Sequence, residues 1–335
     1  MSDWEPVIDP YSTLGARAAA VLQKITEEAI EAGGLDSVLL LAYRGAAEQN
    51  REWLNRAVDH LNAAISGADA LYSLKRFQLF GGLAGLGWTL AFVMRQLGRT
   101  QGVARLNEDV DAALLQELQR GRWNGPYGLA TGLAGIGVYF RHGLPDGKAK
   151  LGFELVRAHL EDAAKRSPDF GGAGVAEGAG GVVGLIDQAV VDGRTNGARP
   201  CSWWNGELAV AAVMLGKSAE KPAWTQDAVE RCLAWAPEQE NDASLLRGAA
   251  GAAHLWSRIY GCTGDARCKD ASGRWWERAI TLLETETPAV GAARVPFLAG
   301  AAGVGLALSA ALIPAQPIWD AALGFMQLRW NGPDS

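Results

Sequence analysis

The chain has 335 residues, of which 49% are hydrophobic, 20% charged and 8% aromatic, a composition typical of a globular protein. Its net charge of −6 argues against nucleic-acid binding, and four cysteines are too few for a disulfide framework at this length. The first 13 residues carry early acidic groups and no apolar run, so no secretory signal is expected and the predicted location is cytoplasmic.

A glycine-rich turn that leads directly into an apolar segment recurs six times along the chain. The fourth turn keeps one glycine, and the others have two or more. Most of the spacings between turns fit one pair of helices with its loops. The leading glycines are Gly82, Gly132, Gly178, Gly206, Gly248 and Gly300.

Between the turns lie amphipathic segments, among them residues 53–65, 107–119 and 274–284, which place apolar side chains on one helical face. The glycine-led segments are nearly uncharged and are therefore predicted to be buried on all sides. Residues 295–315 contain no charge, but their Gly and Ala content and the prolines near both ends favour a buried helix over a membrane span. Alternating strand patterns are scarce.

These features predict an all-α fold, an α,α-toroid with two concentric layers of helices. The glycine-led helices would form the inner layer and the amphipathic helices the outer one. A solenoid is the alternative, but its terminal repeats should be more polar, and here the last repeat is the most apolar. We expect one domain over residues 1–335, with residues 1–12 and 331–335 frayed.

Glycines at a helix start allow backbones to approach closely and allow positive φ angles. If the inner helices run parallel, their N-termini meet at one end of the ring, which we call the mouth. Free N–H groups and helix dipoles would make the mouth electropositive and suited to an anion, a thiolate or a developing enolate. We therefore expect any chemistry to reside in or just before the glycine turns.

The turns resemble, in order, the motifs of the lanthionine cyclase (LanC-like) family, over about residues 71–330. The third turn reads Gly174-Val175-Ala176-Glu177-Gly178, the fourth Trp203-Trp204-Asn205-Gly206, and the fifth Leu245-Leu246-Arg247-Gly248. Residues 296–303 and 317–320 are similar to the family's C-terminal end. The resemblance implies an α,α-toroid that forms thioether rings in peptides.

The chain departs from the family where the family binds zinc. The resemblance places the two Cys and one His ligands at Trp204, Leu246 and Arg247, none of which can bind zinc here. A family Asp is replaced by Gly128, and a family acid–base His is replaced by Glu177. We therefore predict no metal and no cofactor. The nearest thiol, Cys201, belongs to no Cys-x-x-Cys pair, and His254 is expected to be a hydrogen-bonded core residue.

Four polar residues could still carry ring formation. Arg247 could pair with a thiolate or enolate, and Glu177 could transfer the proton if burial raises its pKa. Glu207 is a second carboxylate candidate, and Asn205 could donate a hydrogen bond. The structural alternative is that Glu177 and Arg247 form a salt bridge in place of a lost active site. For peptide binding we predict the aromatic side chains that precede glycine turns, which core filling explains equally well: Trp123, Tyr127, Trp203 and Trp204.

Three functions remain open at this point. The first is a zinc-independent cyclase that adds a Cys thiol to a dehydroamino acid in a precursor peptide, with dehydration left to a separate dehydratase or kinase/lyase partner. The second is an inactive toroid that binds the peptide or scaffolds a modifying complex. The third is another enzyme on a helical barrel, such as a glycosidase using Glu177 and Glu207.

Overall fold

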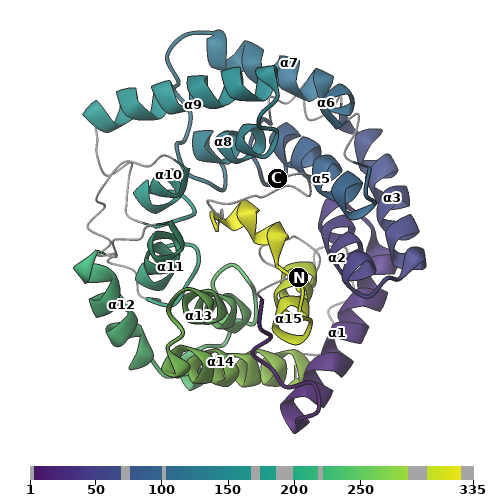
Figure 1. Cartoon of the computed structure of the whole chain (residues 1–335), viewed down its shortest axis with the longest axis vertical. Coiled ribbons are helices and arrows are strands. Elements are labelled where there is room, and N and C mark those ends of the chain that lie inside the picture. Colours follow the sequence, from purple (N-terminus) through teal and green to yellow (C-terminus); the bar gives the residue numbers. More distant parts are fainter. Residues whose placement is uncertain are drawn as a thin grey trace.

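The chain forms a ring of helices in two concentric layers (Figure 1). The computed structural model describes residues 4–68, 76–99, 103–166, 174–185, 199–217, 222–285 and 300–325, and no strand occurs in these ranges. The inner layer holds α2 (Leu35–Ala47), α5 (Leu83–Gln96), α8 (Leu133–His142), α10 (Ala179–Leu185), α11 (Glu207–Lys217), α13 (Ala249–Thr263) and α15 (Ala301–Leu312). The outer layer holds α1 (Thr13–Ala32), α3 (Arg51–Ile65), α6 (Val103–Leu106), α7 (Glu108–Gln119), α9 (Gly147–Arg166), α12 (Ala223–Leu233) and α14 (Ala266–Thr285).

The ring is closed on itself. In the inner layer α15 packs against both α13 and α2, and in the outer layer α14 packs against α1. The predicted toroid is therefore confirmed, and the solenoid alternative is wrong. The burial pattern is also the one predicted for the two layers. The glycine-led helices are almost wholly buried, and each outer helix buries one face. In α3, for example, only Ala57 and Leu61 are fully buried.

One inner helix was not predicted from the sequence. The helix α2 begins after Gly33-Gly34 rather than at a repeated turn, yet all of its residues from Ser37 to Gly45 are buried. It packs between α15 and α5, against α3 and α1. The last inner helix, α15, is buried as predicted. Among the described helices, none combines the length and the apolarity that a membrane span requires.

The C-terminal part of the chain turns back into the ring. After α15, the 3₁₀ helix η3 (Ile318–Leu323) lies inside the inner layer, coloured yellow near the centre of Figure 1. Its Trp319 and Asp320 are completely buried. The middle of the toroid is thus occupied by this chain's own residues. A second short 3₁₀ helix, η1 (Pro237–Gln239), precedes the fifth turn.

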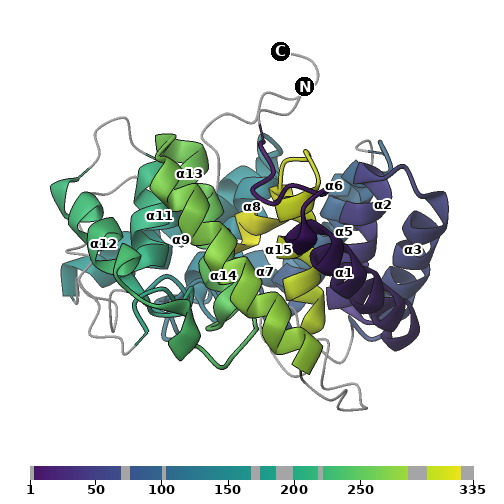
Figure 2. The same cartoon turned by 90° about the horizontal axis from the view of Figure 1, so that it is seen from below.

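The prediction that residues 1–12 fray is wrong for the described residues from Trp4 onward. Trp4 is buried, and its indole Nε1 donates to the carbonyl of Ala310 at 2.7 Å. The backbone N–H of Ile8 donates to Ala311 at 3.0 Å. Figure 2 shows the ring edge-on, with this segment in dark purple reaching one of its two sides. Residues 331–335 lie outside the described ranges.

Candidate functional site

The glycines of the turns are required by close approach of the backbone to itself. Four leading glycines (Gly82, Gly132, Gly248 and Gly300) are extended, with φ between −102° and −133°. The expected positive φ is therefore wrong at these positions, but it is found at Gly81, which precedes Gly82 and has a φ of 77°. A Cβ on Gly85, three positions after the leading Gly82, would lie 1.8 Å from the carbonyl oxygen of Leu79. A Cβ on the glycine at the same position of three other turns, Gly135, Gly181 or Gly251, would meet the equivalent carbonyl at 2.2–2.4 Å.

A ladder of backbone hydrogen bonds joins successive turns. The N–H of Phe80 donates to Ala130 at 3.4 Å, and that of Ala130 donates to Ala176 at 2.8 Å. Ala176 donates in turn to Trp204 at 3.1 Å, and Trp204 donates to Leu246 at 3.2 Å. Each of these residues stands two positions before a leading glycine. The first five turns therefore lie side by side at one end of the ring, which confirms the parallel inner helices and the mouth.

The expectation of free N–H groups at the mouth is wrong for at least one N–H in the first turn of each of four helices. One N–H in the first turn of each of these helices donates to a carbonyl of its own glycine turn, at 2.8–3.1 Å, rather than facing a ligand. These N–H groups belong to Leu83, Leu133, Leu208 and Ala249, which donate to Arg76, Pro126, Pro200 and Asp242. The helix dipoles still favour negative charge at this end. Directional hydrogen bonds to a negatively charged ligand at this end must therefore come from side chains.

The residue immediately before each of the first five leading glycines belongs to what we call the rim of the mouth: Gly81, Thr131, Glu177, Asn205 and Arg247. Glu177 is partly exposed and the other four are exposed. The Thr131 hydroxyl donates to the Glu177 carboxylate, with Oγ1 at 2.8 Å from Oε2 and 3.1 Å from Oε1. Sequence reasoning missed Thr131, although its place in the repeat, next to Gly132, marks it as a rim residue.

Arg247 extends over the indole of Trp204, with its Cζ 5.2 Å from the ring centroid. No ion pair joins Arg247 to Glu177 among the residues that the structure describes, so the salt-bridge alternative does not hold there. Asn205 is exposed beside them on the rim. Backbone contact explains why position 128 is glycine, because a Cβ on Gly128 would lie 2.4 Å from the Cα of Glu177.

The donor set at the mouth does not fit zinc. Trp204 and Leu246 are held next to each other by the turn ladder, and neither side chain has a lone pair that zinc accepts. Arg247 keeps its positive charge. Within the described residues, no three His, Cys, Asp or Glu side chains gather closely enough to hold a metal ion.

Cys201 does not repair this deficit because it faces away from the mouth. It is buried, with Sγ 3.9 Å from the carbonyl oxygen of Cys232 on α12. The neighbouring Cys232 thiol and burial together raise the pKa of Cys201. All four cysteines are thiols, so no disulfide joins Cys262 to Cys268.

Two of the predicted site residues are engaged in the protein's own structure. The Glu207 side chain is buried, and its carboxylate receives Arg231 of α12 in a bidentate ion pair at 2.7 and 3.1 Å. Trp203 is 1% exposed, and its Nε1 donates to the carbonyl of Leu323 in η3 at 3.1 Å. We therefore assign both to the fold. Trp204, one residue later, is partly exposed and remains at the mouth.

Trp123 and Tyr127 lie together at the edge of the second turn. The Trp123 indole donates to Pro126 at 2.9 Å, and the Tyr127 hydroxyl donates to the Trp123 carbonyl at 3.3 Å. Arg166, the last residue of α9, donates to the Tyr127 hydroxyl at 3.2 Å. Both aromatic side chains are partly exposed, so they border the mouth on its outer-layer side.

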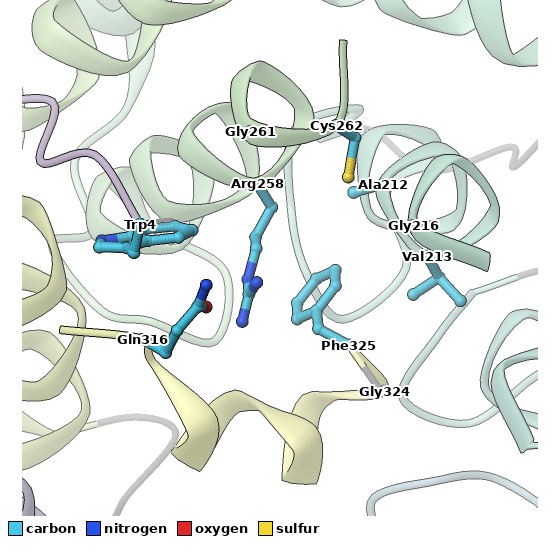
Figure 3. Close-up of a pocket in the computed structure, with 10 residues that line it drawn as sticks. All are labelled: Trp4, Ala212, Val213, Gly216, Arg258, Gly261, Cys262, Gln316, Gly324 and Phe325. Atoms are coloured by element: carbon cyan, nitrogen blue, oxygen red, sulfur yellow. The ribbon is translucent and has the colours of Figure 1, made fainter. Parts of the chain in front are cut away.

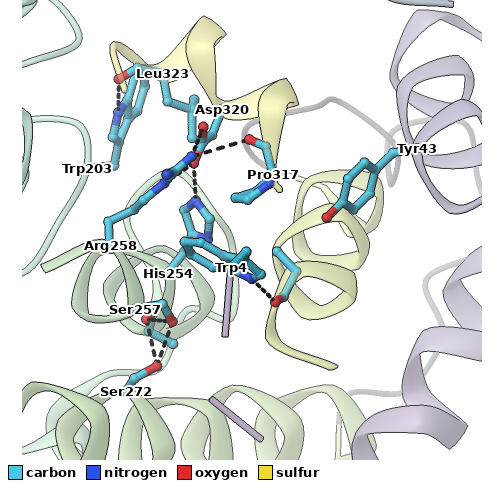
Figure 4. A network of polar contacts seen from close by, with 12 residues as sticks. Trp4, Tyr43, Trp203, His254, Ser257, Arg258, Ser272, Pro317, Asp320 and Leu323 are labelled. Carbon is cyan, nitrogen blue, oxygen red and sulfur yellow. Dashed lines mark hydrogen bonds and ion pairs between the residues drawn. The ribbon is translucent and has the colours of Figure 1, made fainter. Parts of the chain in front are cut away.

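A buried polar network anchors η3 at the centre of the ring (Figure 4). Asp320 accepts a hydrogen bond from His254 Nε2 at 2.8 Å and an ion pair from Arg258, both on α13. His254 is 2% exposed, which confirms its prediction as a core residue, and burial lowers its pKa. Every polar atom of the Asp320 carboxylate is therefore used within the core, and the network holds no group for the mouth.

Comparisons with known proteins agree with this description. A family model described as lanthionine synthetase C-like protein matches residues 25–144. Among solved structures, nisin cyclase matches with a TM-score of 0.52 and 14% sequence identity, over 92% of this chain and 97% of that chain. At this identity the likeness is one of fold. A search of curated proteins gave no match. The comparisons thus show a likeness to lanthionine synthetase C-like proteins over residues 25–144 and a toroid fold shared with nisin cyclase.

Proposed function

We propose that this protein forms thioether rings in a dehydrated, Cys-containing peptide without zinc. The observation that carries the proposal is the rim, where the turn ladder holds Glu177 and Arg247 at the same end of the ring with Trp204 beneath the guanidinium. The family match and the nisin cyclase fold support a cyclase-like role. The substrate class is an extension from that family.

The proposed reaction is a Michael addition, which is balanced without an oxidant or reductant. Glu177 accepts the proton of the substrate thiol, and the sulfur adds to the β-carbon of a dehydroalanine or dehydrobutyrine. The electron pair of the Cα–Cβ double bond moves onto the neighbouring carbonyl as an enolate, which Arg247 stabilises by charge and hydrogen bonding. The proton on Glu177 then returns to the α-carbon.

The remaining rim residues position these groups. Thr131 holds the Glu177 carboxylate from the neighbouring turn through its hydroxyl. Trp204 and Leu246 offer an apolar surface for the substrate where the family places metal ligands, and partial exclusion of water strengthens the pairing of Arg247 with an anion. Asn205 supplies one further donor at the rim. Trp123 and Tyr127 border the path by which a peptide would reach these groups.

Site variants test the assignment. We expect Arg247→Met to slow ring formation by about 10²–10³-fold and Glu177→Gln by about 10²–10⁴-fold. Thr131→Val should slow it less, because the carboxylate remains. Matched controls are Arg274→Met and Glu31→Gln, exposed positions on α14 and α1. Rings are counted by mass spectrometry after alkylation of the remaining thiols. Equal rates in site and control variants would refute these roles.

A second candidate function is an inactive toroid that binds the precursor peptide. It is favoured by the commitment of Glu207 to Arg231 and of Trp203 to η3, which leaves fewer polar groups at the mouth. Tight peptide binding without ring formation would support it, as would a stable complex with a separate dehydratase. A glycosidase pairing Glu177 with Glu207 is disfavoured, because the Glu207 carboxylate is held by α12.

A further inference from the structure

A cavity of about 320 Å³ lies beside the last turns of α11 and α13 (Figure 3). Its lining includes Val213 and Gly216 from the C-terminal half of α11 and Gly261 and Cys262 from the end of α13. Because the N-termini of these helices form the mouth, their last turns lie at the other side. Trp4 of the N-terminal segment, Gln316 before η3 and Phe325 after η3 also line the cavity.

Arg258 stands between the two aromatic walls. Its Cζ lies 5.0 Å from the Trp4 ring centroid and 5.7 Å from that of Phe325. Its Nε and Nη2 bind Asp320, and Nη2 also donates to the carbonyl of Pro317 at 3.4 Å. The second terminal nitrogen, Nη1, makes no hydrogen bond within the described residues. Arg258 therefore brings a donor to the cavity wall while its charge is already balanced by Asp320.

We call the part of the cavity between α11 and α13, which Gly216 and Gly261 line, the slot. Gly216 and Gly261 leave space where side chains would project, since a Cβ on either would make only ordinary contacts, at 3.9 Å from Cys262 and from Trp4 respectively. Both glycines lie in last helical turns, where backbone carbonyls lack intrahelical N–H partners and can accept from a ligand. The slot thus offers a donor, nearby acceptors and apolar walls.

We propose that this cavity binds an extended peptide segment, with one apolar side chain in the slot between α11 and α13. A peptide carbonyl would accept from Arg258 Nη1, and a peptide N–H would donate to a helix-end carbonyl. A free anion fits less well because Asp320 already neutralises Arg258, and an acyl chain would leave the polar groups without partners. The volume lies at the lower end of the range for small-ligand pockets, which suits one or two residues.

The exposed thiol of Cys262 at the cavity makes the proposal testable by disulfide exchange. The purified protein is incubated with the mixed disulfide of N-acetyl-leucyl-cysteamine and cysteamine, in the presence of 2-mercaptoethanol. The Cys262 thiolate attacks the fragment disulfide, joins the fragment sulfur and releases cysteamine. N-acetyl-seryl-cysteamine is the matched polar fragment, with the same linker and amides. Intact-mass spectrometry measures the fraction captured at equilibrium.

We expect the leucyl fragment to be captured at least about tenfold more strongly than the seryl fragment. The reason is that the apolar leucyl side chain moves out of water when it enters the slot. Gly216→Leu, which fills the slot, should bring the ratio to about one, and Gly261→Leu provides the same test from α13. Gly273→Leu on α14, where a Cβ meets nothing within 4 Å, should leave the ratio unchanged.

A ratio near one in the unmodified protein would overturn the proposal, because capture would then report only the exposure of Cys262. A high ratio that persists in both slot-filling variants would overturn it as well. The test uses no dehydrated peptide, so its outcome is separate from ring formation at the mouth.

Discussion

The anchoring of η3 by Asp320 gives the sharpest quantitative prediction for stability. Asp320 is completely buried and holds Arg258 and His254 together. Substitution by alanine leaves the largely buried guanidinium of Arg258, at the cavity wall, without its counter-ion. Breaking a buried pair by removing one partner costs about 3–5 kcal/mol.

The size of the protein converts this cost into a melting shift. At about 2.1 cal/mol/K per residue, a chain of 335 residues unfolds with an entropy of about 0.7 kcal/mol/K near its melting temperature. Asp320→Ala should therefore lower Tm by about 4–7 °C. Circular dichroism at 222 nm, at pH 7.5, measures the melt. Asp227→Ala, an exposed position on α12, is the control and should shift Tm by less than about 1 °C. An equally small shift in Asp320→Ala would refute the anchoring role.

Three further predictions concern other parts of the fold. Burial lowers the pKa of His142 to about 3, so the unfolded chain binds a proton that the folded chain does not as pH falls below about 6.5. Urea unfolding at pH 7 and pH 5 should show a loss of about 2 kcal/mol at the lower pH that His142→Asn reduces. Gly85→Ala, whose Cβ meets a backbone carbonyl, should destabilise by about 1–3 kcal/mol, whereas Gly273→Ala in open space should be neutral or stabilising. Glu207→Gln should lower stability by about 1 kcal/mol and leave the ring-formation rate unchanged, and a rate loss like that of Glu177→Gln would contradict our assignment.

The repeated turns were enough to predict the toroid because each combines a helix start with a backbone contact that only glycine allows. The contact at Gly85 is an example: it lies within one turn, so it leaves a local signature in the sequence. The helix α2 left no such signature, because it starts after Gly33-Gly34 outside the repeat.

The position of η3 and of the N-terminal segment could not be predicted, because both depend on partners far away in the chain. The indole of Trp4 binds a carbonyl 306 residues away, and Asp320 pairs with α13 across more than 60 residues. No periodicity reports such contacts. A polar residue near a terminus gives no indication from sequence alone that it lies in the core.

The candidate site was predictable in its position and only in part in its members. The register of the turns places Glu177 and Arg247 on the rim, and it could also have identified Thr131. Glu207 is not available at the mouth because its carboxylate binds Arg231, which lies 24 residues later in the chain on the outer helix α12. Side-chain pairing between layers therefore decided which carboxylate stays available.

Ring formation in the presence of a metal chelator tests zinc-independent cyclisation most directly. A dehydrated peptide containing free Cys is incubated with and without the protein, with EDTA in both samples, and the remaining thiols are alkylated before mass spectrometry. Zinc-independent cyclisation predicts faster loss of alkylatable thiol with the protein, at the same rate when EDTA is omitted. Thiol loss that is no faster with the protein than without it would contradict the proposed function.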